Sequence, residues 1–428
     1  MPYLLATNGM DAGRTYELAE GRVQIGRGPD CQLFLDAESV SRQHATLHLH
    51  GPRCTVEDNG SRNGTFLNNH RIGTLVVLGE GDQLRIGDLK FSFHLSPLEP
   101  PIVDPDADGG AEEEAPAKEV CLEVLRQRAD LLRRSREFFD QRGFLEVETP
   151  LVSRDTVVDR YIEPVPMTIS GQRMWLQTSP EFAMKRLLAA GAEAIYQLTR
   201  AFRDGEQGSR HNPEFTILEW YRVGDSMQQA MTLLDELSQS LLDLKPARRM
   251  SYSQAFQQCL DFDPLTSSSS TLLKKIASLD FQPPENWRSM DRDGWLNLLL
   301  AEFIEPWLAD QPTILYDYPA SQAALAIVRD DDPPVAERFE LYVDGVELAN
   351  GYHELLDAEE LLRRNQEVNR LRKQDGRVEL PVESQLLEAM RDGIADCCGV
   401  ALGFDRLAMV ASGAANIQQV IAFPFDQA

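Results

Sequence analysis

The chain has 428 residues, enough for two or three domains that each bury a sizeable core. Hydrophobic residues make up 43% of the composition and charged residues 26%, as in ordinary soluble globular proteins. The formal net charge of −26 argues against non-specific nucleic-acid binding, which draws its affinity from Lys and Arg on phosphates. A local basic patch for a specific acidic partner stays compatible with this charge.

The start of the chain and its cysteines indicate a reduced, cytoplasmic protein. The stretch MPYLLATNGMDAGRTYEL has no basic region followed by an apolar run, so we expect no secretory signal in it. No stretch of the sequence approaches the roughly 20 apolar residues of a membrane span, so no membrane association is expected. The six cysteines are scattered without CxxC spacing, which predicts no cysteine-based metal site.

Residues 1–98 are rich in short strand-like segments. Gly and Asn-Gly turns separate them at short and fairly regular spacing, a pattern typical of an all-β sandwich. The expected strands are 14–19, 22–27, 44–50, 54–58, 65–69, 74–79, 82–88 and 89–95.

Three polar clusters lie in the expected loops of this sandwich, at 26–27, 41–44 and 59–65. A rigid sandwich presents loop side chains to partners, and arginines with neutral donors suit a phosphorylated peptide. The expected phosphate donors are Arg27, Ser41, Arg42, Arg62 and Asn63. The alternative is that these clusters only shape turns, with His44 satisfying a buried carbonyl.

In this order and spacing, GR, SRQH and NGSRNGTFLN resemble the forkhead-associated (FHA) domain over nearly all of residues 1–98. The resemblance implies that the domain binds a protein containing phosphothreonine. By the family pattern, Arg27, Ser41 and Arg42 meet the phosphate. Arg62 and Asn63 then position the peptide backbone, and His44 is structural.

Residues 99–118, EPPIVDPDADGGAEEEAPAK, contain Pro, Gly, Ala and acidic residues with almost nothing to bury. Such a composition cannot offset the entropy of ordering, so it predicts a flexible linker. The linker separates the domain at 1–98 from a larger one at 119–428.

The larger part mixes helical and strand patterns, which predicts an α+β domain with a largely antiparallel sheet. The apolar spacing of 120–142 predicts a helix that ends at Gly143, a favourable left-handed C-cap. Further helices are expected around 181–190, 227–245, 291–308, 357–374 and 383–393. Strands are expected near 174–177, 195–203, 215–223, 313–318, 324–328, 338–349 and 400–403.

The most informative segment is 202–222, FRDGEQGSRHNPEFTILEWYR, which has a strand–loop–strand pattern. Arg203 beside the loop suits a phosphate, because a guanidinium pairs bidentately with phosphate oxygens. In the second strand Phe215, Ile217, Glu219 and Tyr221 share one face. A buried Glu219 on that face requires a cationic partner. The alternative is a half-exposed strand with ordinary surface charges.

This segment resembles motif 2 of the class II aminoacyl-tRNA synthetases. RGFLEVETP before it resembles motif 1, a helix–strand dimerisation element that ends at Pro150, and GVALGFDRLAM at 399–409 resembles motif 3. The three ordered motifs cover essentially all of residues 120–428. The resemblance implies a class II synthetase-like fold, the use of ATP and a homodimer.

The resemblance also implies residue roles, in a reaction that depends mostly on positioning and charge stabilisation. Arg203 is expected to be catalytic on the α-phosphate and substrate carboxylate, and Arg406 on the γ-phosphate. The other expected ATP-binding residues are Glu206, His211, Asn212, Phe215, Glu340 and Glu347, with Phe215 beneath adenine. Glu340 and Glu347 are expected to hold Mg²⁺, which takes oxygen ligands. The alternative for this acidic pair is a solvated strand edge.

One position departs from the family pattern. Motif 2 usually reads Phe-Arg-x-Glu, whereas Gly205 stands at the Glu position here and Glu206 follows it. We expect Glu206 to contact ATP in its place, because motif 2 loops vary in length and path. If it does not, adenylation is weakened.

The charges of the pocket predict a long cationic substrate side chain. Glu219, Tyr221 and Glu354 add its anionic and hydrogen-bonding part, while Glu181 either acts as a helix N-terminal carboxylate or meets the substrate amine. TSPE, HNPEF, E-x-Y and ELANGYHEL resemble the lysine branch of the class II enzymes. Two carboxylates facing one ammonium discriminate against neutral substrates. Ala349 and Asn350 are expected in the same pocket.

The domain resembles the elongation factor P–lysine ligase family more than the lysyl-tRNA synthetases. The synthetases carry an N-terminal OB-fold that grips the anticodon, whereas this chain has an FHA domain and an acidic linker there. No tRNA partner is therefore expected. Ala349 supports the ligase family, in which Ala replaces the Gly of the synthetases, but it leaves α- versus β-lysine open.

The family transfers activated lysine, preferably (R)-β-lysine, to a lysine side chain of elongation factor P. The sequence therefore predicts an ATP-dependent ligase that forms the lysyl or (R)-β-lysyl adenylate and modifies elongation factor P, with an FHA domain for recruitment or regulation. One alternative is a lysyl-adenylate-forming enzyme with a different acceptor. Another is a phosphopeptide-binding scaffold with an inactive ligase domain.

Overall fold

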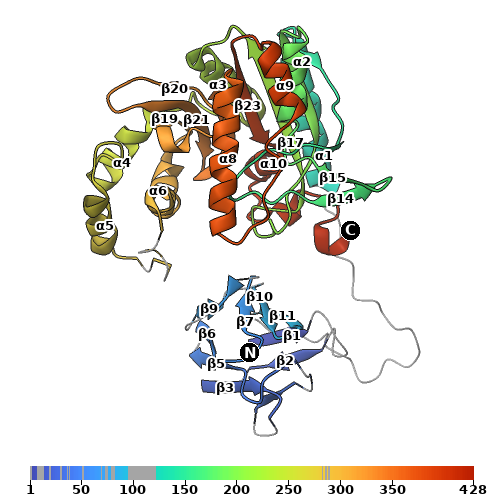
Figure 1. Ribbon diagram of the computed structural model, residues 1–428, viewed down its shortest axis with the longest axis vertical. Helices are drawn as coiled ribbons and strands as arrows, with labels where there is room; N and C mark the ends of the chain where they lie inside the picture. The colour runs from blue at the N-terminus through green and yellow to red at the C-terminus, as the bar shows by residue number, and fades with distance from the viewer. Residues whose placement is uncertain are drawn as a thin grey trace. The chain divides into compact units, whose positions relative to one another are not determined.

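The computed structural model describes residues 2–6, 14–18, 21–28, 31–35, 37, 39–50, 53–68, 70–72, 76–78, 82–94, 122–281, 283–284, 287 and 290–428. The chain divides into two compact units, Met1–Glu113 and Glu114–Ala428, which we describe separately (Figure 1). The linker expected at 99–118 lies outside the described residues. Within the described part, no helix is long and apolar enough to span a bilayer.

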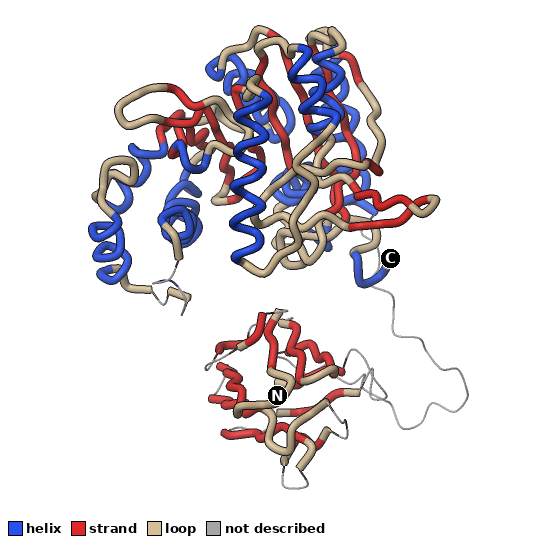
Figure 2. Tube along the Cα trace, in the orientation of Figure 1, coloured by secondary structure: helices blue, strands red, loops and turns tan. Residues whose placement is uncertain are grey.

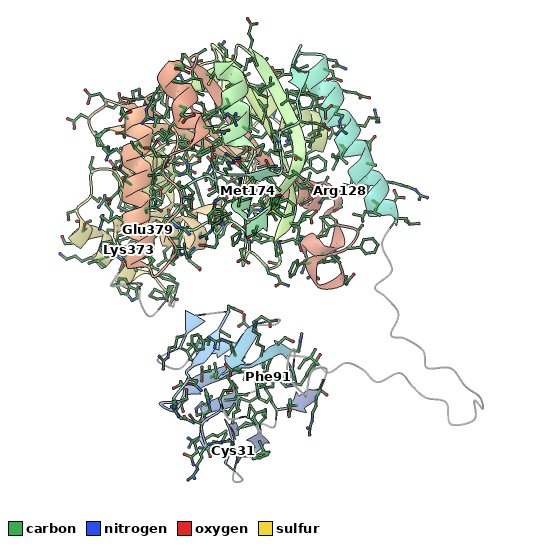
Figure 3. The ribbon with its side chains drawn as sticks, turned by 45° about the vertical axis from the view of Figure 1, so that its right-hand side comes forward. Cys31, Phe91, Arg128, Met174, Lys373 and Glu379 are labelled. Atoms are coloured by element: carbon green, nitrogen blue, oxygen red, sulfur yellow. The ribbon has the colours of Figure 1, made fainter. Side chains whose placement is uncertain are left out.

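The first unit is a sandwich of two β-sheets, as predicted (Figure 2). One sheet has the order β2 (Thr15–Glu17), β1 (Tyr3–Ala6), β11 (Leu89–His94), β10 (Gln83–Ile86), β7 (Thr65–Leu67) and β8 (His70–Arg71). The other has the order β4 (Leu33–Phe34), β3 (Gly21–Gly26), β5 (Ala45–His50), β6 (Arg53–Asp58) and β9 (Val76–Leu78). Alternate residues such as Ile25 and Leu47 fill the core between the sheets. Phe91, labelled in Figure 3, belongs to the same core.

The second unit is built on a nine-stranded sheet. Its order is β12 (Leu145–Glu146), β16 (Ala194–Phe202), β17 (Glu214–Val223), β23 (Cys397–Gly403), β22 (Val346–His353), β21 (Val335–Val343), β19 (Thr313–Pro319) and β18 (Arg248–Ser251), with β20 (Val328–Arg329) beside β21. Only the β12–β16 and β18–β19 pairs are parallel, which confirms the largely antiparallel α+β prediction. A small sheet of β13 (Val152–Ser153), β15 (Gln172–Leu176) and β14 (Pro166–Ile169) lies apart from it.

Helices cover both faces of the large sheet. On one face, α1 (Leu122–Asp140), α3 (Met227–Leu242) and α10 (Phe404–Ser412) form a core with Leu218 and Trp220. The other face carries α2 (Glu181–Ala189), which packs on Ile195 and Tyr221 and contacts α9 (Gln385–Asp392) and, through it, α8 (Ala358–Gln374). A second core joins β19 to α4 (Tyr252–Leu260), α5 (Ser269–Ser278) and α6 (Arg292–Leu299).

Several element predictions were wrong in detail. The strand expected at 338–349 is the β21–β22 hairpin, because Asp344 and Gly345 both adopt positive φ, at 51° and 70°, the geometry that an Asp-Gly turn favours. The helix expected at 291–308 changes to a π-helix at Leu300–Ile304 before α7 (Glu305–Trp307), where Pro306 lacks an N–H. The strand expected at 324–328 survives only as β20. Strands β1, β4, β8, β13, β14 and β18 and helices α4 and α5 were missed.

Candidate functional site

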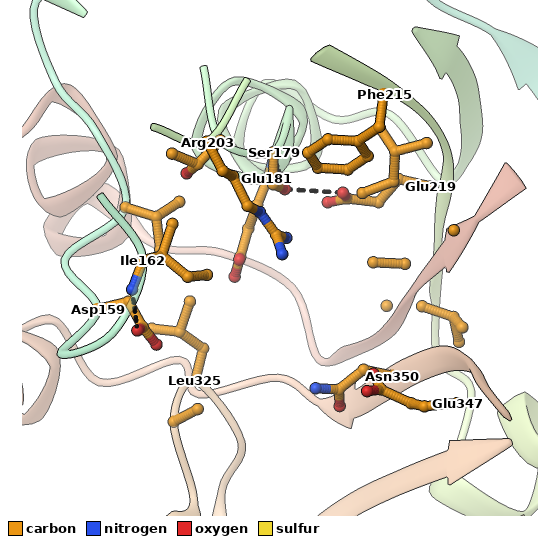
Figure 4. A pocket seen from close by; sticks show the side chains of 18 of the residues that line it. Asp159, Ile162, Ser179, Glu181, Arg203, Phe215, Glu219, Leu325, Glu347 and Asn350 are labelled. Atoms are coloured by element: carbon orange, nitrogen blue, oxygen red, sulfur yellow. Dashed lines mark hydrogen bonds between the residues drawn. The ribbon is translucent and has the colours of Figure 1, made fainter. Parts of the chain in front are cut away.

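A cavity of about 380 Å³ lies in the second unit, on the side of the sheet that carries α2 and α8. Most of the predicted ATP- and amino-acid-binding residues line it. These are Glu181, Arg203, Glu206, His211, Asn212, Phe215, Glu219, Tyr221, Glu347, Asn350, Glu354 and Arg406. In Figure 4, Arg203 and Glu181 lie between Phe215 and Glu219 on one side and Asp159, Ile162 and Leu325 on the other.

Strand β17 turns one row of side chains toward the cavity, as its alternation predicts. Phe215, Ile217, Glu219 and Tyr221 line the cavity, whereas Leu218 and Trp220 between them belong to the opposite core. Strand β16 ends at Phe202, opposite Glu214 of β17, so the loop between them carries Arg203 and Glu206 to the cavity mouth.

Arg203 is placed to bind an anion. Its guanidinium carbon lies 4.9 Å from the centre of the Phe215 ring, and its Nη1 lies 3.7 Å from the Glu206 carboxylate. Among the described residues, its buried Nε has no hydrogen-bond partner. A buried, unsatisfied donor costs free energy, and a phosphate or carboxylate in the cavity would remove that cost.

Arg406, bonded to His211, brings a second positive charge close to Arg203. Arg406 donates from Nη2 to Nε2 of His211 at 2.7 Å and from Nη1 to the Glu347 carbonyl at 3.0 Å. Burial and the charges of Arg406, Arg203 and Arg210 lower the pKa of His211 to about 4. His211 is therefore neutral at pH 7, and the positive charge resides on the guanidinium groups.

The side chain of Asn212 forms hydrogen bonds with the backbone of the protein. Its Nδ2 donates to the Glu214 carbonyl at 2.6 Å, and its Oδ1 accepts from the Phe425 amide at 3.1 Å. Asn212 lines the cavity, but its polar atoms tie the C-terminal segment to the start of β17.

The predicted acidic pair needs a correction. Glu347 lines the cavity, but Glu340 does not. Both oxygens of Glu340 are occupied, one by Arg338 at 2.6 Å and the other by the Tyr318 and Tyr342 hydroxyls at 2.5 Å. A carboxylate has about four lone-pair sites, and these donors fill three of them, so metal ligation by Glu340 stays a prediction.

Glu347 lies among both carboxylates and guanidinium groups. Burial and the nearby charge of Glu340 raise the pKa of Glu347, and Arg406 opposes the shift from 3.5 Å. The pKa of Glu305, which sequence reasoning missed, rises to about 7 because of burial and the charges of Glu347 and Glu340. The hard oxygens of these carboxylates suit Mg²⁺, and a bound cation would favour their ionised forms. Within the described residues no cluster of three or more ligating side chains could hold a metal alone, so phosphate oxygens would have to complete its shell.

The amino-acid end of the cavity is built around Glu219, which is only 1% exposed. Its two oxygens accept from the Ser179 hydroxyl at 2.7 Å and the Tyr221 hydroxyl at 2.6 Å, and the expected contact with a cation stays a prediction. Burial, with the charge of Glu181, raises the pKa of Glu219 to about 7. Burial raises the pKa of Glu354 as well, to about 8. A substrate ammonium would stabilise the ionised forms of both carboxyls.

Sequence reasoning missed Lys185 in this region. Its Nζ lies 2.5 Å from a carboxylate oxygen of Glu181 and 2.5 Å from one of Glu354. Glu181 and Lys185 are four residues apart on α2, a spacing that favours an ion pair and could have revealed this contact. Other cavity residues that the sequence did not single out include Arg210, Arg338, Tyr352 and Asn365.

The expectation for Ala349 was wrong. Its side chain belongs to the core cluster on the opposite face of the sheet and does not line the cavity, because neighbouring residues of a strand point to opposite faces. Asn350 beside it does line the cavity. Within the described residues, its buried Oδ1 has no hydrogen-bond donor, so this acceptor is open to a ligand.

In the first unit, the predicted phosphopeptide residues lie in loops that hydrogen bonds connect. The Arg27 amide donates to the Ser41 carbonyl at 2.9 Å, and the Arg62 amide donates to the Ser41 hydroxyl at 3.1 Å. Asn63 donates from its side chain to the Ser39 carbonyl at 2.8 Å. Within the described residues, the exposed side chains of Arg27, Arg42 and Arg62 make no ion pair.

The buried side chain of His44 connects these loops through hydrogen bonds. It is fully buried, its Nδ1 accepts from the Ser41 amide at 3.0 Å, and its Nε2 lies 3.1 Å from the Gly64 carbonyl. Burial lowers the pKa of His44, so the neutral imidazole is the form that makes both bonds. This structural role agrees with the expectation that His44 satisfies a buried carbonyl.

Comparisons with known proteins agree with both units. A profile of the family described as "tRNA synthetases class II (D, K and N)" matches residues 116–427, and a profile of the FHA domain matches residues 23–87. A protein of Yersinia enterocolitica named elongation factor P–(R)-β-lysine ligase is 45% identical over 311 residues, which are 71% of this chain and 95% of the relative. Proteins of the same name from Salmonella gallinarum and Salmonella paratyphi B are 46% identical over the same shares. The chain therefore belongs to the class II (D, K and N) tRNA synthetase family, in the branch of the elongation factor P–(R)-β-lysine ligases, and carries an FHA domain at its N-terminus.

Proposed function

We propose that this enzyme activates lysine or (R)-β-lysine with ATP and transfers the aminoacyl group to a lysine side chain of elongation factor P. The observation that carries the proposal is the placement of Glu181, Glu219 and Glu354 in the same cavity as Arg203 and Arg406. One end of that cavity suits ammonium groups, and the other suits phosphates.

Different residues bind the amines, the carboxylate and the phosphates. Glu219 and its neighbours hold the substrate amines, while Arg203 holds the substrate carboxylate and the α-phosphate at the distance needed for attack. Arg203 also stabilises the negative charge that develops as pyrophosphate leaves, and Arg406 receives the terminal phosphate. Phe215 stacks on adenine, and Glu206 serves in place of the usual motif 2 Glu.

Mg²⁺, when bound with ATP, neutralises phosphate charge. Glu347 fits this role, since its carboxylate lines the cavity and a cation there would favour its ionised form. Glu340 does not line the cavity, and it acts through its charge while its oxygens accept from Arg338, Tyr318 and Tyr342.

The test is ATP–pyrophosphate exchange with L-lysine, with (R)-β-lysine and without an amino acid, followed by mass spectrometry of elongation factor P. The expected result is amino-acid-dependent exchange and a mass gain on one lysine. Exchange without the mass gain would favour a different acceptor, and charging of tRNA would contradict the proposed choice of acceptor. No exchange at all would favour the scaffold with an inactive ligase domain.

For the FHA domain we propose binding of a phosphothreonine-containing protein, which recruits or regulates the enzyme. The exposed guanidinium groups of Arg27, Arg42 and Arg62, on loops that His44 holds together, support it. Titration of the full chain with a phosphothreonine peptide library should find binders that Arg27→Ala weakens. Binding that survives Arg27→Ala, or no binding to any library member, would contradict it.

We further propose a cytoplasmic homodimer with domains at 1–98 and 119–428. Strand β12 lies at the sheet edge, and Leu145 on it is 62% exposed, as expected of a surface that a second copy covers. The five described cysteines are all free thiols, as a reducing compartment would keep them. Light scattering should give a dimer mass that Leu145→Asp shifts toward the monomer.

A further inference from the structure

Lys185 is a buried ammonium at the amino-acid end of the cavity, and the proposed mechanism does not use it. Its side chain is 2% exposed, and its Nζ lies 2.5 Å from both Glu181 and Glu354. Glu181 precedes it by one turn of α2, whereas Glu354 follows β22, far away in the sequence. Lys185 therefore joins the helix to the end of a strand through two carboxylates that line the cavity.

The region holds three carboxyls against one ammonium. Glu181, Glu219 and Glu354 line the cavity, and besides burial the charge of Glu181 raises the pKa of Glu219 and of Glu354. The Tyr221 and Tyr352 hydroxyls and the Cys397 and Cys398 thiols nearby stay neutral because burial raises the pKa of each, while the charged Arg203 and Arg338 also line the cavity. With all three carboxyls ionised, the three carboxylates and Lys185 together carry two net negative charges.

Two negative charges match the two ammonium groups of a lysine-type amino acid. Without Lys185, three ionised carboxylates would face one another in a buried space, where the mutual repulsion of like charges is strong. One of them would then hold a proton and lose its affinity for an ammonium. Lys185 opposes this, because its charge favours the ionised forms of Glu219 and Glu354.

Lys185 is not itself a nucleophile or base. Its two carboxylate neighbours keep it charged by raising its pKa despite burial, and a protonated ammonium has no lone pair to offer. It does not line the cavity, so it acts on the substrate only through Glu181 and Glu354.

We infer that Lys185 is a positioning residue, which fixes Glu181 and Glu354 and sets the charge of the pocket so that it accepts a substrate with two ammonium groups. The substrate amines bind beside Lys185 and do not displace it. This inference rests on the proposed lysine activation and adds a specificity-determining residue to it.

The test compares Lys185→Met with Lys373→Met in the full-length enzyme. Methionine keeps the length of the lysine stem, and Lys373 is a matched control because its side chain is 73% exposed and lies 3.8 Å from Glu379, labelled beside it in Figure 3. Lysine-dependent ATP–pyrophosphate exchange is measured from pH 6 to 9, with KM determined separately for lysine and for ATP.

At pH 7, Lys185→Met should raise the KM for lysine by about tenfold or more, since one pKa unit corresponds to about tenfold in affinity. The KM for ATP should stay within about twofold. In addition, the pH above which the lysine KM becomes constant should move upward. Without the Lys185 charge the pocket carboxyls hold their protons to a higher pH, and these protons compete with the substrate ammonium. A lysine KM that is unchanged, or that rises equally at every pH, would overturn the inference.

A double variant keeps the test decisive if Lys185→Met folds poorly. Lys185→Met with Glu354→Gln removes one charge of each sign and restores two net negative charges. It should bind lysine better than Lys185→Met alone, whereas a merely structural role predicts that the double variant is worse than either single one. Absence of lysine-dependent exchange in the unmodified enzyme would instead contradict the proposed function, so the two failures are distinguishable.

Discussion

The Tyr221 hydroxyl donates a 2.6 Å hydrogen bond to the Glu219 carboxylate, two residues before it on β17. The pair places a carboxyl whose pKa is raised to about 7 on the wall of the cavity. Because alternate residues of a strand share a face, the carboxyl proposed to bind the substrate and the hydroxyl bonded to it come from one local pattern.

Lysine binding should depend on pH in the range where Glu219 and Glu354 titrate. Their pKa values are raised to about 7 and about 8, so at pH 6 both carboxyls hold a proton and bind an ammonium weakly. The lysine KM should therefore fall by about tenfold or more as the pH rises from 6 to 8.5. Exchange kinetics at saturating ATP measure this, and His211 does not contribute, since its pKa of about 4 lies below the range. A lysine KM independent of pH would contradict the assignment.

Gly399 should not tolerate a methyl group. A Cβ there would lie 2.2 Å from the Tyr221 ring and 2.4 Å from the Glu354 carboxylate. Gly399→Ala should destabilise the fold by about 1–3 kcal/mol through overpacking and raise the lysine KM by displacing both side chains. Gly403→Ala on the same strand is the stability control, because its nearest neighbour would lie at 3.7 Å. Equal denaturation midpoints for the two variants would count against this account.

His211 should titrate far below an ordinary histidine. Its pKa is lowered to about 4 by burial and then by the charge of Arg406. Arg406→Met should raise the pKa of His211, because it removes a positive charge 2.7 Å away. Nuclear magnetic resonance titration of the imidazole measures both values. A titration midpoint near 6.5 in the unmodified enzyme would contradict the burial of His211 beside Arg406.

Arg128 should be essential for stability. It lies on α1 (Figure 3), its side chain is 11% exposed, and it contacts the buried Asp405 carboxylate at 2.5 Å and the Thr216 hydroxyl at 2.8 Å. Arg128→Met leaves a buried charge unpaired and should cost about 3–5 kcal/mol in the free energy of unfolding. The control is Arg126, whose side chain is 75% exposed and forms an ion pair with Glu123. Arg126→Met should cost less than about 1 kcal/mol. Urea unfolding of both variants decides the matter.

Much of the fold was predictable because its patterns are local. The sandwich could be inferred from short alternating strands, and helices α1, α2, α3, α8 and α9 from apolar spacing and caps. The errors occur where the local pattern is ambiguous or short, as in the two-residue strands β4 and β8. The Asp344-Gly345 pair is a hairpin-turn signal that was present in the sequence, but the strand prediction for 338–349 did not use it.

The sequence by itself determined the family, the two-part organisation and the row of Phe215, Glu219 and Tyr221, because strand alternation and motif spacing need only neighbouring residues. Only the tertiary structure decided what each carboxyl contacts. Lys185 reaches Glu354 because α2 packs beside the end of β22, and Glu340 is occupied because Arg338, Tyr318 and Tyr342 surround it. Such contacts join segments far apart in the chain, and the burial and charge that shift a pKa exist only once those segments have packed together.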